Sequence, residues 1–330
     1  MGGSSWSDDY YRDREEERKK TGKSAFVHDS YMSSVPVSER KVHEKMDPKG
    51  VTRESCDSDA HPDSLPVAVM FDHTGSMGAI PMVLQKKLSQ LMGLIIRKGY
   101  AAHPQVLFGS IGDTCDSGSI QVGQFESGIE MDDDLGRLWL VGGGGGGMQE
   151  SYQNALYFFA RHTKLDSLNK RDKRGYLFLI GDEWPYPKVL AHEVRDLFGD
   201  SIQRDIPIEE IIMEARKLYN IFFIIPRGAS HGRSLELENR WKALLGGQNV
   251  LILEQPEGVC ESIATAIGLC EGAVDLDGAT RDLRDTGAST AVVKAVEDAL
   301  GPLAKSVALA KVGTGDLPGS SSKSSKVSRL

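Results

Sequence analysis

The sequence predicts an α/β protein with a doubly wound, mostly parallel six-stranded sheet, and three observations lead to that prediction. Short apolar runs rich in Val, Ile, Leu and Phe recur along the chain, as in strands that are buried on both faces. Segments with apolar residues at helical spacing separate most of these runs. Two runs lie too close together for a crossover helix, so we expect them to pair as an antiparallel hairpin.

The expected strands and helices alternate along the chain, as is typical of sheets that helices cover on both faces. Only the turn 113–117 separates the second strand from the third, which makes the third strand the antiparallel edge. The strands are expected at residues 65–72, 105–112, 119–125, 175–180, 221–226 and 249–253. The helices are expected at residues 79–97, 132–140, 150–162, 188–198, 208–219, 235–245 and 259–269.

Shifts in composition predict four parts of the chain. The first part is dense in both charges and poor in large apolar residues, so we expect a flexible, disordered arm in which residues 13–20 could form a short solvated helix. The alternative is an arm that becomes ordered on a partner. The third part is expected to be a connection at residues 275–288 and a C-terminal helix at 290–309, which Gly301-Pro302 kinks or divides. The parts are the arm (1–63), the α/β domain (64–272), the linker with the C-terminal helix (273–312) and a disordered Gly/Ser/Lys-rich tail (313–330).

Charge and composition argue against several classes of function. The formal net charge of -8 does not suit a protein built mainly to bind nucleic acid or anionic membrane. No apolar run approaches the roughly 18 residues of a membrane span, and the polar N-terminus is unlike a secretory signal. The four cysteines lack CxxC spacing. We therefore expect a reduced, cytoplasmic protein without a nucleic-acid or membrane partner.

The segment Asp72-His73-Thr74-Gly75-Ser76 lies where the first strand ends and the first helix approaches. In open α/β sheets, ligands bind at the carboxyl ends of the strands. Asp72, Thr74 and Ser76 alternate, so one carboxylate and two hydroxyls can face one point. Such hard oxygen ligands suit Mg²⁺ or a similar cation. The alternative is a turn in which Asp72 and Thr74 only cap the following helix.

Two further loops are expected at the same end of the sheet, and with them the chain resembles the von Willebrand factor A (vWA) domain over residues 64–272. That family holds a metal ion through a DxSxS motif, a Thr or Asp from a second loop and an Asp from a third. Asp72, Thr74 and Ser76 match the first element, with Thr in place of the middle Ser, and Asp182 in Ile180-Gly181-Asp182 matches the third.

The second element departs from the family pattern. After the six glycines at residues 142–147, the chain continues as Met148-Gln149-Glu150-Ser151, without the usual Thr or Asp. Glu150 or Ser151 could supply the oxygen ligand, or a water could. The glycine run itself is either a linker or, because it opens a helix, an anion-binding turn.

The resemblance implies a protein-interaction module and not an enzyme. It implies that Thr74 and Ser76 contact Mg²⁺ or Mn²⁺ directly, while Asp72 and Asp182 act through waters. The ion would then stay electrophilic and accept a carboxylate from a partner protein. Intracellular members of the family work beside AAA+ ATPases or in multi-component assemblies, so such an ATPase is an expected partner.

Two other functions stay open. A metal-dependent phosphohydrolase would use Asp72 as its nucleophile, but Thr74 stands where such an enzyme needs a second Asp. A scaffold would make its contacts through the charged N-terminal arm.

Several side chains near the expected site have two interpretations. Asp113 either lies near the site or belongs only to the hairpin turn. Trp184 and Tyr186 either form a docking rim or pack on their own loop. His73 either contacts a partner or a water of the site, or is simply exposed. The other histidines, His231 among them, show no metal-ligand spacing, and we expect them at the surface or in the core.

Overall fold

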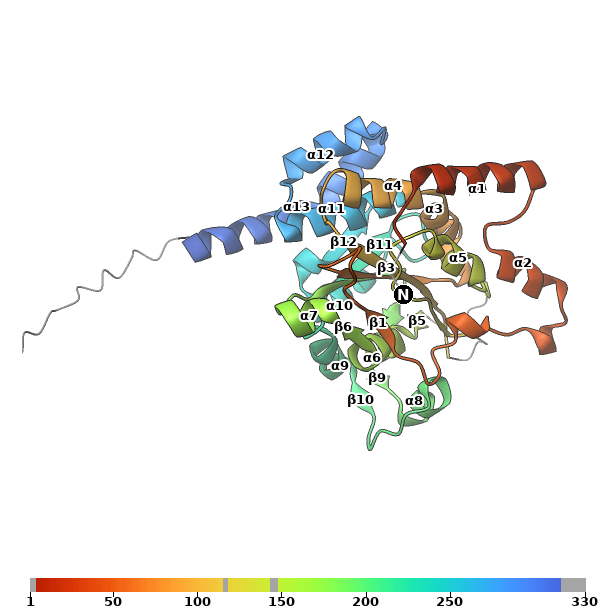
Figure 1. Cartoon of the computed structure of the whole chain (residues 1–330). Coiled ribbons are helices and arrows are strands. Elements are labelled where there is room, and N and C mark those ends of the chain that lie inside the picture. The colour runs from red at the N-terminus through yellow and green to blue at the C-terminus, as the bar shows by residue number, and fades with distance from the viewer. Residues whose placement is uncertain (1–3, 115–117, 143–147, 316–330) are drawn as a thin grey trace, which may run out of the picture.

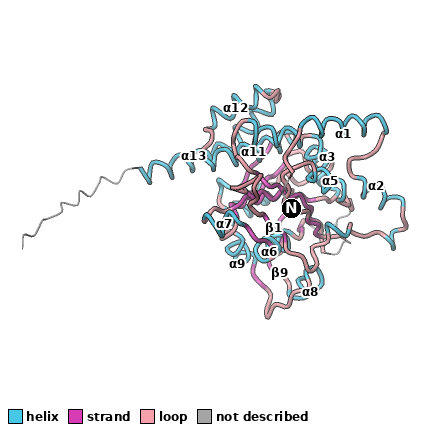
Figure 2. Tube along the Cα trace, viewed as in Figure 1, coloured by secondary structure: helices cyan, strands magenta, loops and turns pink. Residues whose placement is uncertain are grey.

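The centre of the protein is one mixed sheet (Figure 2). The computed structural model describes residues 4–114, 118–142 and 148–315. The strand order is β12-β11-β7-β2-β3-β4, and all neighbours are parallel except β4, which runs antiparallel to β3. The prediction of an α/β protein with six strands and an antiparallel edge is confirmed. The strands are β2 (Leu65–Asp72), β3 (Pro104–Ile111), β4 (Ile120–Val122), β7 (Gly175–Ile180), β11 (Tyr219–Pro226) and β12 (Val250–Leu253).

Successive side chains of each strand enter two separate hydrophobic cores, one on each face of the sheet. In β2, Val69 and Phe71 enter the first core, whereas Ala68 and Met70 enter the second. All residues of β2 are buried, which explains why its sequence is a continuous apolar run and not an alternating pattern.

Helices cover both cores, above and below the sheet in Figure 1. The helices that contribute to the first core are α1 (Asp8–Thr21), α3 (Ile80–Lys86), α4 (Leu88–Met92), α5 (Glu130–Arg137), α11 (Val259–Glu271), α12 (Leu276–Asp285) and α13 (Thr290–Gly315). Those that contribute to the second are α6 (Tyr152–Arg161), α8 (Ala191–Phe198), α9 (Ile208–Ala215) and α10 (Leu235–Leu245). The short helix α7 (Asp166–Arg171) packs Leu168 against the second core, and α2 (Val27–Ser34) lies outside both sets.

Three small two-stranded sheets, which the sequence analysis did not predict, fasten loops to one another. Their pairs are β1 (Arg53–Ser55) with β6 (Thr163–Leu165), β5 (Gln149–Glu150) with β8 (Trp184–Pro185), and β9 (Lys188–Val189) with β10 (Ile206–Pro207). The second pair joins the segment after the glycine run to the loop after β7.

The N-terminal segment differs from the disordered arm that composition predicts. The short helix expected at residues 13–20 is part of the longer α1, whose Tyr11 is buried and donates a hydrogen bond to the Gln85 carbonyl oxygen. Phe26 is also buried in the first core. A few apolar side chains in a charged segment can therefore dock on an existing domain, which an argument about the segment alone misses.

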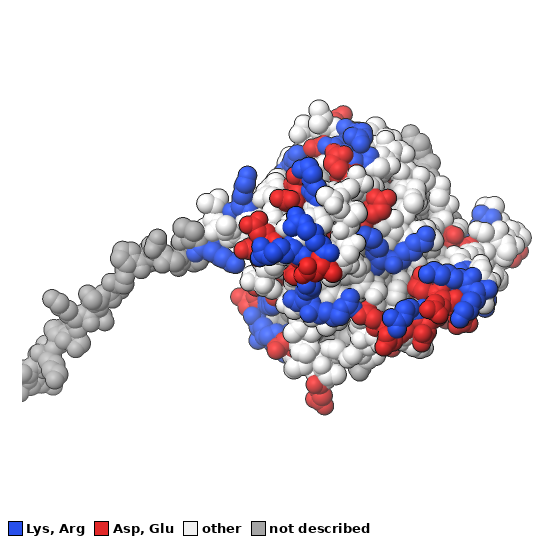
Figure 3. Space-filling model, turned by 90° about the horizontal axis from the view of Figure 1, so that it is seen from above, with Lys and Arg blue, Asp and Glu red and all other residues white. Residues whose placement is uncertain are grey.

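Acidic and basic side chains are interspersed on the face seen in Figure 3.

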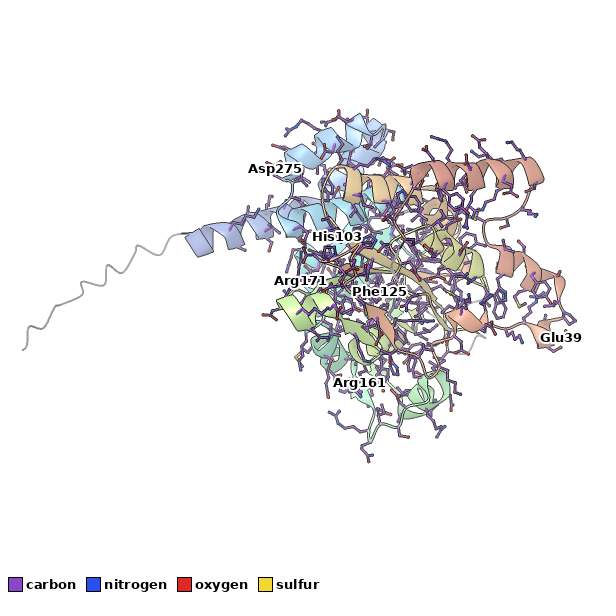
Figure 4. All side chains as sticks on the ribbon, in the orientation of Figure 1. Glu39, His103, Phe125, Arg161, Arg171 and Asp275 are labelled. Atoms are coloured by element: carbon purple, nitrogen blue, oxygen red, sulfur yellow. The ribbon has the colours of Figure 1, made fainter. Side chains whose placement is uncertain are left out.

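The C-terminal part also differs from expectation. Residues 275–288, expected to be a connection, contain helix α12, whose N-cap Asp275 accepts a hydrogen bond from the Gly278 amide at 2.7 Å (Figure 4). The predicted C-terminal helix is α13, and it runs through Pro302 without dividing. The first long helix expected after β2 is instead interrupted at Lys87 and ends in a π-helical turn over Gly93–Arg97. Most of the expected disordered tail, residues 316–330, lies outside the described residues.

Candidate metal centre

The site lies where the adjacent parallel strands β2 and β7 end. Phe71 pairs with Ile180, so Asp72 and Asp182 follow at the same edge of the sheet. From β2 the chain continues to β3 on one side, and from β7 it continues to β11 on the other. In open α/β sheets, ligands bind at such points, where the connections leave the strands in opposite directions.

Four of the predicted site residues form one continuous chain of hydrogen bonds. The Thr74 amide and hydroxyl both donate to Asp72 Oδ1, at 2.7 and 2.6 Å. The Ser76 hydroxyl donates to Asp182 Oδ1 at 2.7 Å. The Thr74 and Ser76 hydroxyl oxygens lie 3.0 Å apart. The local alternation of the segment therefore brings the two hydroxyls between the two carboxylates.

Asp72 is enclosed on all sides and is fully buried. Its Oδ2 accepts a hydrogen bond from the Tyr152 hydroxyl at 3.3 Å. Burial raises the pKa of Asp72 to about 7, although the hydrogen bonds from Thr74 act in the opposite direction. Ser76, by contrast, is only half-buried, so the cluster faces solvent on the side of its hydroxyl groups.

The structure brings Glu150 into the same cluster. The β5–β8 pairing sets Glu150 beside Pro185, next to the loop that carries Asp182. Glu150 is buried, and one of its carboxylate oxygens, Oε2, has no hydrogen-bond partner among the described residues. Burial, together with the charges of Asp72 and Glu183, raises the pKa of Glu150 to about 10.

Ser151, the other candidate from this loop, has a buried hydroxyl with no hydrogen-bond partner in the described part of the chain. The glycine run before it lies outside the described residues except for Gly142. The Gly142 carbonyl oxygen would lie 3.2 Å from a Cβ atom added to Gly75, so the glycine run begins close to the Asp72 turn. Whether the glycines bind an anion stays untested.

Two residues that the sequence analysis did not assign, Glu183 and His231, adjoin Asp182. The His231 amide donates to Asp182 Oδ2 at 2.7 Å. Its ring Nδ1 lies 3.6 Å from both Asp182 Oδ2 and Glu183 Oε1, and one ligand atom of each of the three residues lies within 4.8 Å of the others. These three side chains form a possible metal-binding triad. Burial, and after it the charges of Asp72 and Asp182, raise the pKa of Glu183 to about 7.

The sequence analysis did not single out His231 as a ligand, because ligand spacing along the sequence cannot detect ligands that different loops supply. The one available signal was position: His231 follows β11 at the edge of the sheet that carries the other loops. The Ser230 amide of the same loop donates to the Ser76 carbonyl oxygen at 3.1 Å, which joins this fourth loop to the Asp72 turn.

His73 is buried, so the interpretation as an exposed side chain is wrong. Its amide donates to the Ile111 carbonyl oxygen at 2.9 Å, so the ladder between β2 and β3 continues through His73 and the ring enters the interior. Gly112 makes room for the ring, since a Cβ atom there would lie 2.6 Å from His73 Nε2. Burial lowers the pKa of His73 to about 4.

The aromatic residues after Asp182 contact their own surroundings. The Tyr186 hydroxyl lies 3.0 and 3.1 Å from the two Asp113 carboxylate oxygens, and the Asp113 charge helps to raise the pKa of Glu150. Asp113 thus lies near the cluster. The Arg240 guanidinium lies over the Trp184 ring, 4.2 Å from its centroid.

No helix in the described ranges is long and apolar enough to cross a membrane.

Comparison with known proteins gives only distant likenesses. The chain matches no protein-family model and no curated protein. Among solved structures it is similar to the pilus adhesin SpaC of Lactobacillus rhamnosus GG in its open conformation, at 10% identity and a TM-score of 0.42, over 69% of this chain and 33% of the adhesin. It is also similar to proximal thread matrix protein 1 of the mussel byssus, at 10% identity and a TM-score of 0.41, over 68% and 47% of the two chains. The chain therefore spans less than half the length of either protein.

Proposed function

We propose that this chain is a vWA-type protein-interaction module with a doubly wound sheet, which binds Mg²⁺ or Mn²⁺ at the end of β2. Thr74 and Ser76 would bind the ion directly, and Asp72 and Asp182 would hold its waters. Glu150, or else Ser151, would complete the protein ligands. The remaining position would accept an Asp or Glu side chain from a partner, so that partner binding depends on the metal.

The contact between the two hydroxyl groups is the observation that carries this proposal. Each hydroxyl has one proton to donate, and Thr74 gives its proton to Asp72 while Ser76 gives its proton to Asp182. No proton is left for the 3.0 Å contact between the two oxygens, so lone pairs face each other there. Neighbouring ligands of an octahedral Mg²⁺ with bonds of about 2.1 Å lie about 3.0 Å apart. A cation would use both lone pairs.

The charge of the cluster also favours a bound cation. The carboxyl groups of Asp72, Glu150, Asp182 and Glu183 are all buried. In the described part of the chain, none of them forms an ion pair with a lysine or arginine; only His231 lies within ion-pair distance, of Asp182 and Glu183. Buried carboxylates without a countercharge are strongly unfavourable. A divalent ion supplies that countercharge.

The inferred partner is a protein that presents an exposed acidic residue inside the cell, and an AAA+ ATPase subunit is the class that the vWA resemblance suggests. The phosphohydrolase alternative has weaker support. Asp72 Oδ1 already accepts two hydrogen bonds from Thr74, and the side chain is fully buried, whereas a nucleophile must reach its substrate.

Titration calorimetry with Mg²⁺ tests the proposal on metal-stripped protein. We expect saturable binding to the wild type, and affinity reduced by about tenfold or more in Ser76→Ala, because a direct ligand is lost. Ser34→Ala removes an exposed hydroxyl that bonds only to the Tyr31 carbonyl oxygen and serves as the matched control. Absence of Mg²⁺ binding, or equal binding by Ser76→Ala, would refute the metal site.

A second assay tests the interaction and the enzyme alternative together. Wild-type protein should retain a carboxylate-bearing partner in the presence of Mg²⁺ and release it on addition of EDTA, and Asp72→Ala should not retain it. Mg²⁺-dependent release of phosphate from a generic phosphomonoester by the wild type, lost in Asp72→Ala, would favour the phosphohydrolase instead.

A further inference from the structure

Asp182 faces two different groups of side chains with its two carboxylate oxygens. Oδ1 accepts the hydrogen bond from Ser76, on the side of the Asp72 turn. Oδ2 accepts the hydrogen bond from the His231 amide and lies 3.6 Å from the His231 ring nitrogen Nδ1. Glu183 Oε1 is also 3.6 Å from that nitrogen. A second cluster, Asp182–Glu183–His231, therefore adjoins the Asp72 turn and is distinct from it.

The distances in this cluster are too long for hydrogen bonds but match those between ligands of one metal ion. A side-chain N–H···O bond has its heavy atoms within about 3.2 Å, so 3.6 Å leaves His231 Nδ1 without a hydrogen bond to either carboxylate. In a tetrahedral zinc site with bonds of about 2.1 Å, neighbouring ligand atoms lie about 3.4 Å apart. His231 Nδ1 is itself buried and has no hydrogen-bond partner among the described residues.

Glu150 supplies an independent indication of a ligand. Its carboxyl group lies close enough to that of Glu183 for their charges to interact, and its Oε2 is buried without a hydrogen-bond partner within the described ranges. The residue is 2% exposed, and the β5–β8 pairing fixes it there. Two carboxyl groups in contact in the interior repel each other unless a proton or a cation lies between them.

We propose that Asp182, Glu183 and His231 bind a zinc-class cation, Zn²⁺ itself in the first instance, with a water at the fourth position that Glu150 would hold. The donor set determines the class of metal: an imidazole nitrogen suits Zn²⁺, whereas Mg²⁺ prefers oxygen ligands alone. The hydrogen bond from the His231 amide to Asp182 fixes the loop, so that the ring nitrogen is held close to the carboxylates. The His231 side chain is 34% exposed, which gives the ion a path from solvent.

This zinc site goes beyond the proposed interaction site and does not require it. The two would share Asp182 through different oxygens, and Glu150 adjoins both, so substitution of either residue cannot separate them. The Ser76 side chain belongs only to the Mg²⁺ site, and the His231 side chain belongs only to the zinc site. Substitutions of these two residues therefore separate the two proposals.

Calorimetric titration of metal-stripped, full-length protein with Zn²⁺ and with Mg²⁺ is the test. His231→Gln should lower the affinity for Zn²⁺ by about tenfold or more and leave Mg²⁺ binding within about twofold. Ser76→Ala should do the opposite. His192→Gln, a change at an exposed histidine of α8, should alter neither. Failure of Mg²⁺ binding alone would refute the proposed function and leave the zinc site standing.

Two results would overturn the zinc site. One is Zn²⁺ affinity in folded His231→Gln equal to that of the wild type. In that case the three side chains lie together without binding zinc. The other result comes from the wild-type protein, so it is informative even if His231→Gln fails to fold. Co²⁺ bound to the wild type should give the intense visible absorption bands of four-coordinate cobalt. A weak, six-coordinate spectrum would contradict the inferred ligand set.

Discussion

At the scale of single residues, Gly181 determines whether Tyr152 can reach Asp72. A Cβ atom on Gly181 would lie 1.7 Å from the Tyr152 hydroxyl oxygen. The Tyr152 ring is held between Phe223 and Trp241, with centroid distances of 5.3 and 5.4 Å, so it cannot swing aside. We expect Gly181→Ala to lower the free energy of unfolding by about 1–3 kcal/mol, measured by urea denaturation, and to weaken Mg²⁺ binding.

Gly301→Ala is the matched control for this substitution. Gly301 lies in α13, and a Cβ atom there would meet nothing within 4 Å. The control should be unchanged, or more stable by up to about 1 kcal/mol because alanine favours helix. Equal stability of the two variants would show that Tyr152 moves freely, and the account of Asp72 would have to change.

Sequence could predict those site residues whose positions depend on local structure. Asp72, Thr74 and Ser76 follow a recognisable buried strand, and their alternation alone brings them together. Glu183 and His231 were not assigned, because they meet only in the folded protein. There, two loops that are far apart in the sequence lie at the same edge of the sheet. Ligand-spacing rules apply only to ligands on one element.

At the scale of elements, α1 shows how a charged segment is held on the domain. The Asp132 side chain is 0% exposed and pairs with both Arg14 and Arg18. Removal of one arginine leaves a buried carboxylate poorly compensated. We expect Arg18→Ala to lower the free energy of unfolding by about 2 kcal/mol, less than complete loss of a buried pair because Arg14 stays.

Arg12→Ala provides the comparison on the same helix. Arg12 pairs with Asp9, but their side chains are 64% and 83% exposed, so the loss should be below about 0.5 kcal/mol. Guanidinium denaturation midpoints of both variants check this difference. If Arg12→Ala and Arg18→Ala are equally destabilising, α1 is not held through Asp132.

The elements that sequence predicted well are those whose own pattern fixes them. Strands β2, β7 and β11 are apolar runs that are buried almost throughout, so they could not be mistaken for surface elements. Helix α12 was missed because its apolar side is narrow: Ala279 and Leu283 are buried among charged residues. Its start depends on the Asp275 cap, a signal that is weak without knowledge of the helices it packs on.

At the scale of the whole molecule, the buried carboxyl groups predict how stability depends on pH. Burial raises the pKa values of Asp72 and Glu183 to about 7, above the values of about 4 expected in the unfolded chain. Between these values the folded protein binds more protons than the unfolded chain, so the free energy of unfolding falls as pH rises. We expect the melting temperature of metal-free protein to fall from about pH 5 to pH 8.

Added Mg²⁺ should reverse this trend, because a cation binds the ionised carboxylates. The rise in melting temperature on addition of Mg²⁺ should be larger at pH 8 than at pH 5. Asp72→Asn cannot ionise and should show a shallower fall in the metal-free state. A metal-free melting temperature that is level or rises over this range in the wild type would contradict the account.

The most direct test of the central claim is a crystal structure of the protein soaked with Mn²⁺, with anomalous scattering recorded to locate the ion. The account predicts an anomalous peak at metal–ligand distance from both Thr74 Oγ1 and Ser76 Oγ, between Asp72 and Asp182. A crystal that takes up Mn²⁺ only elsewhere, with the Thr74 and Ser76 hydroxyls still hydrogen-bonded to the two carboxylates and no peak beside them, would contradict it.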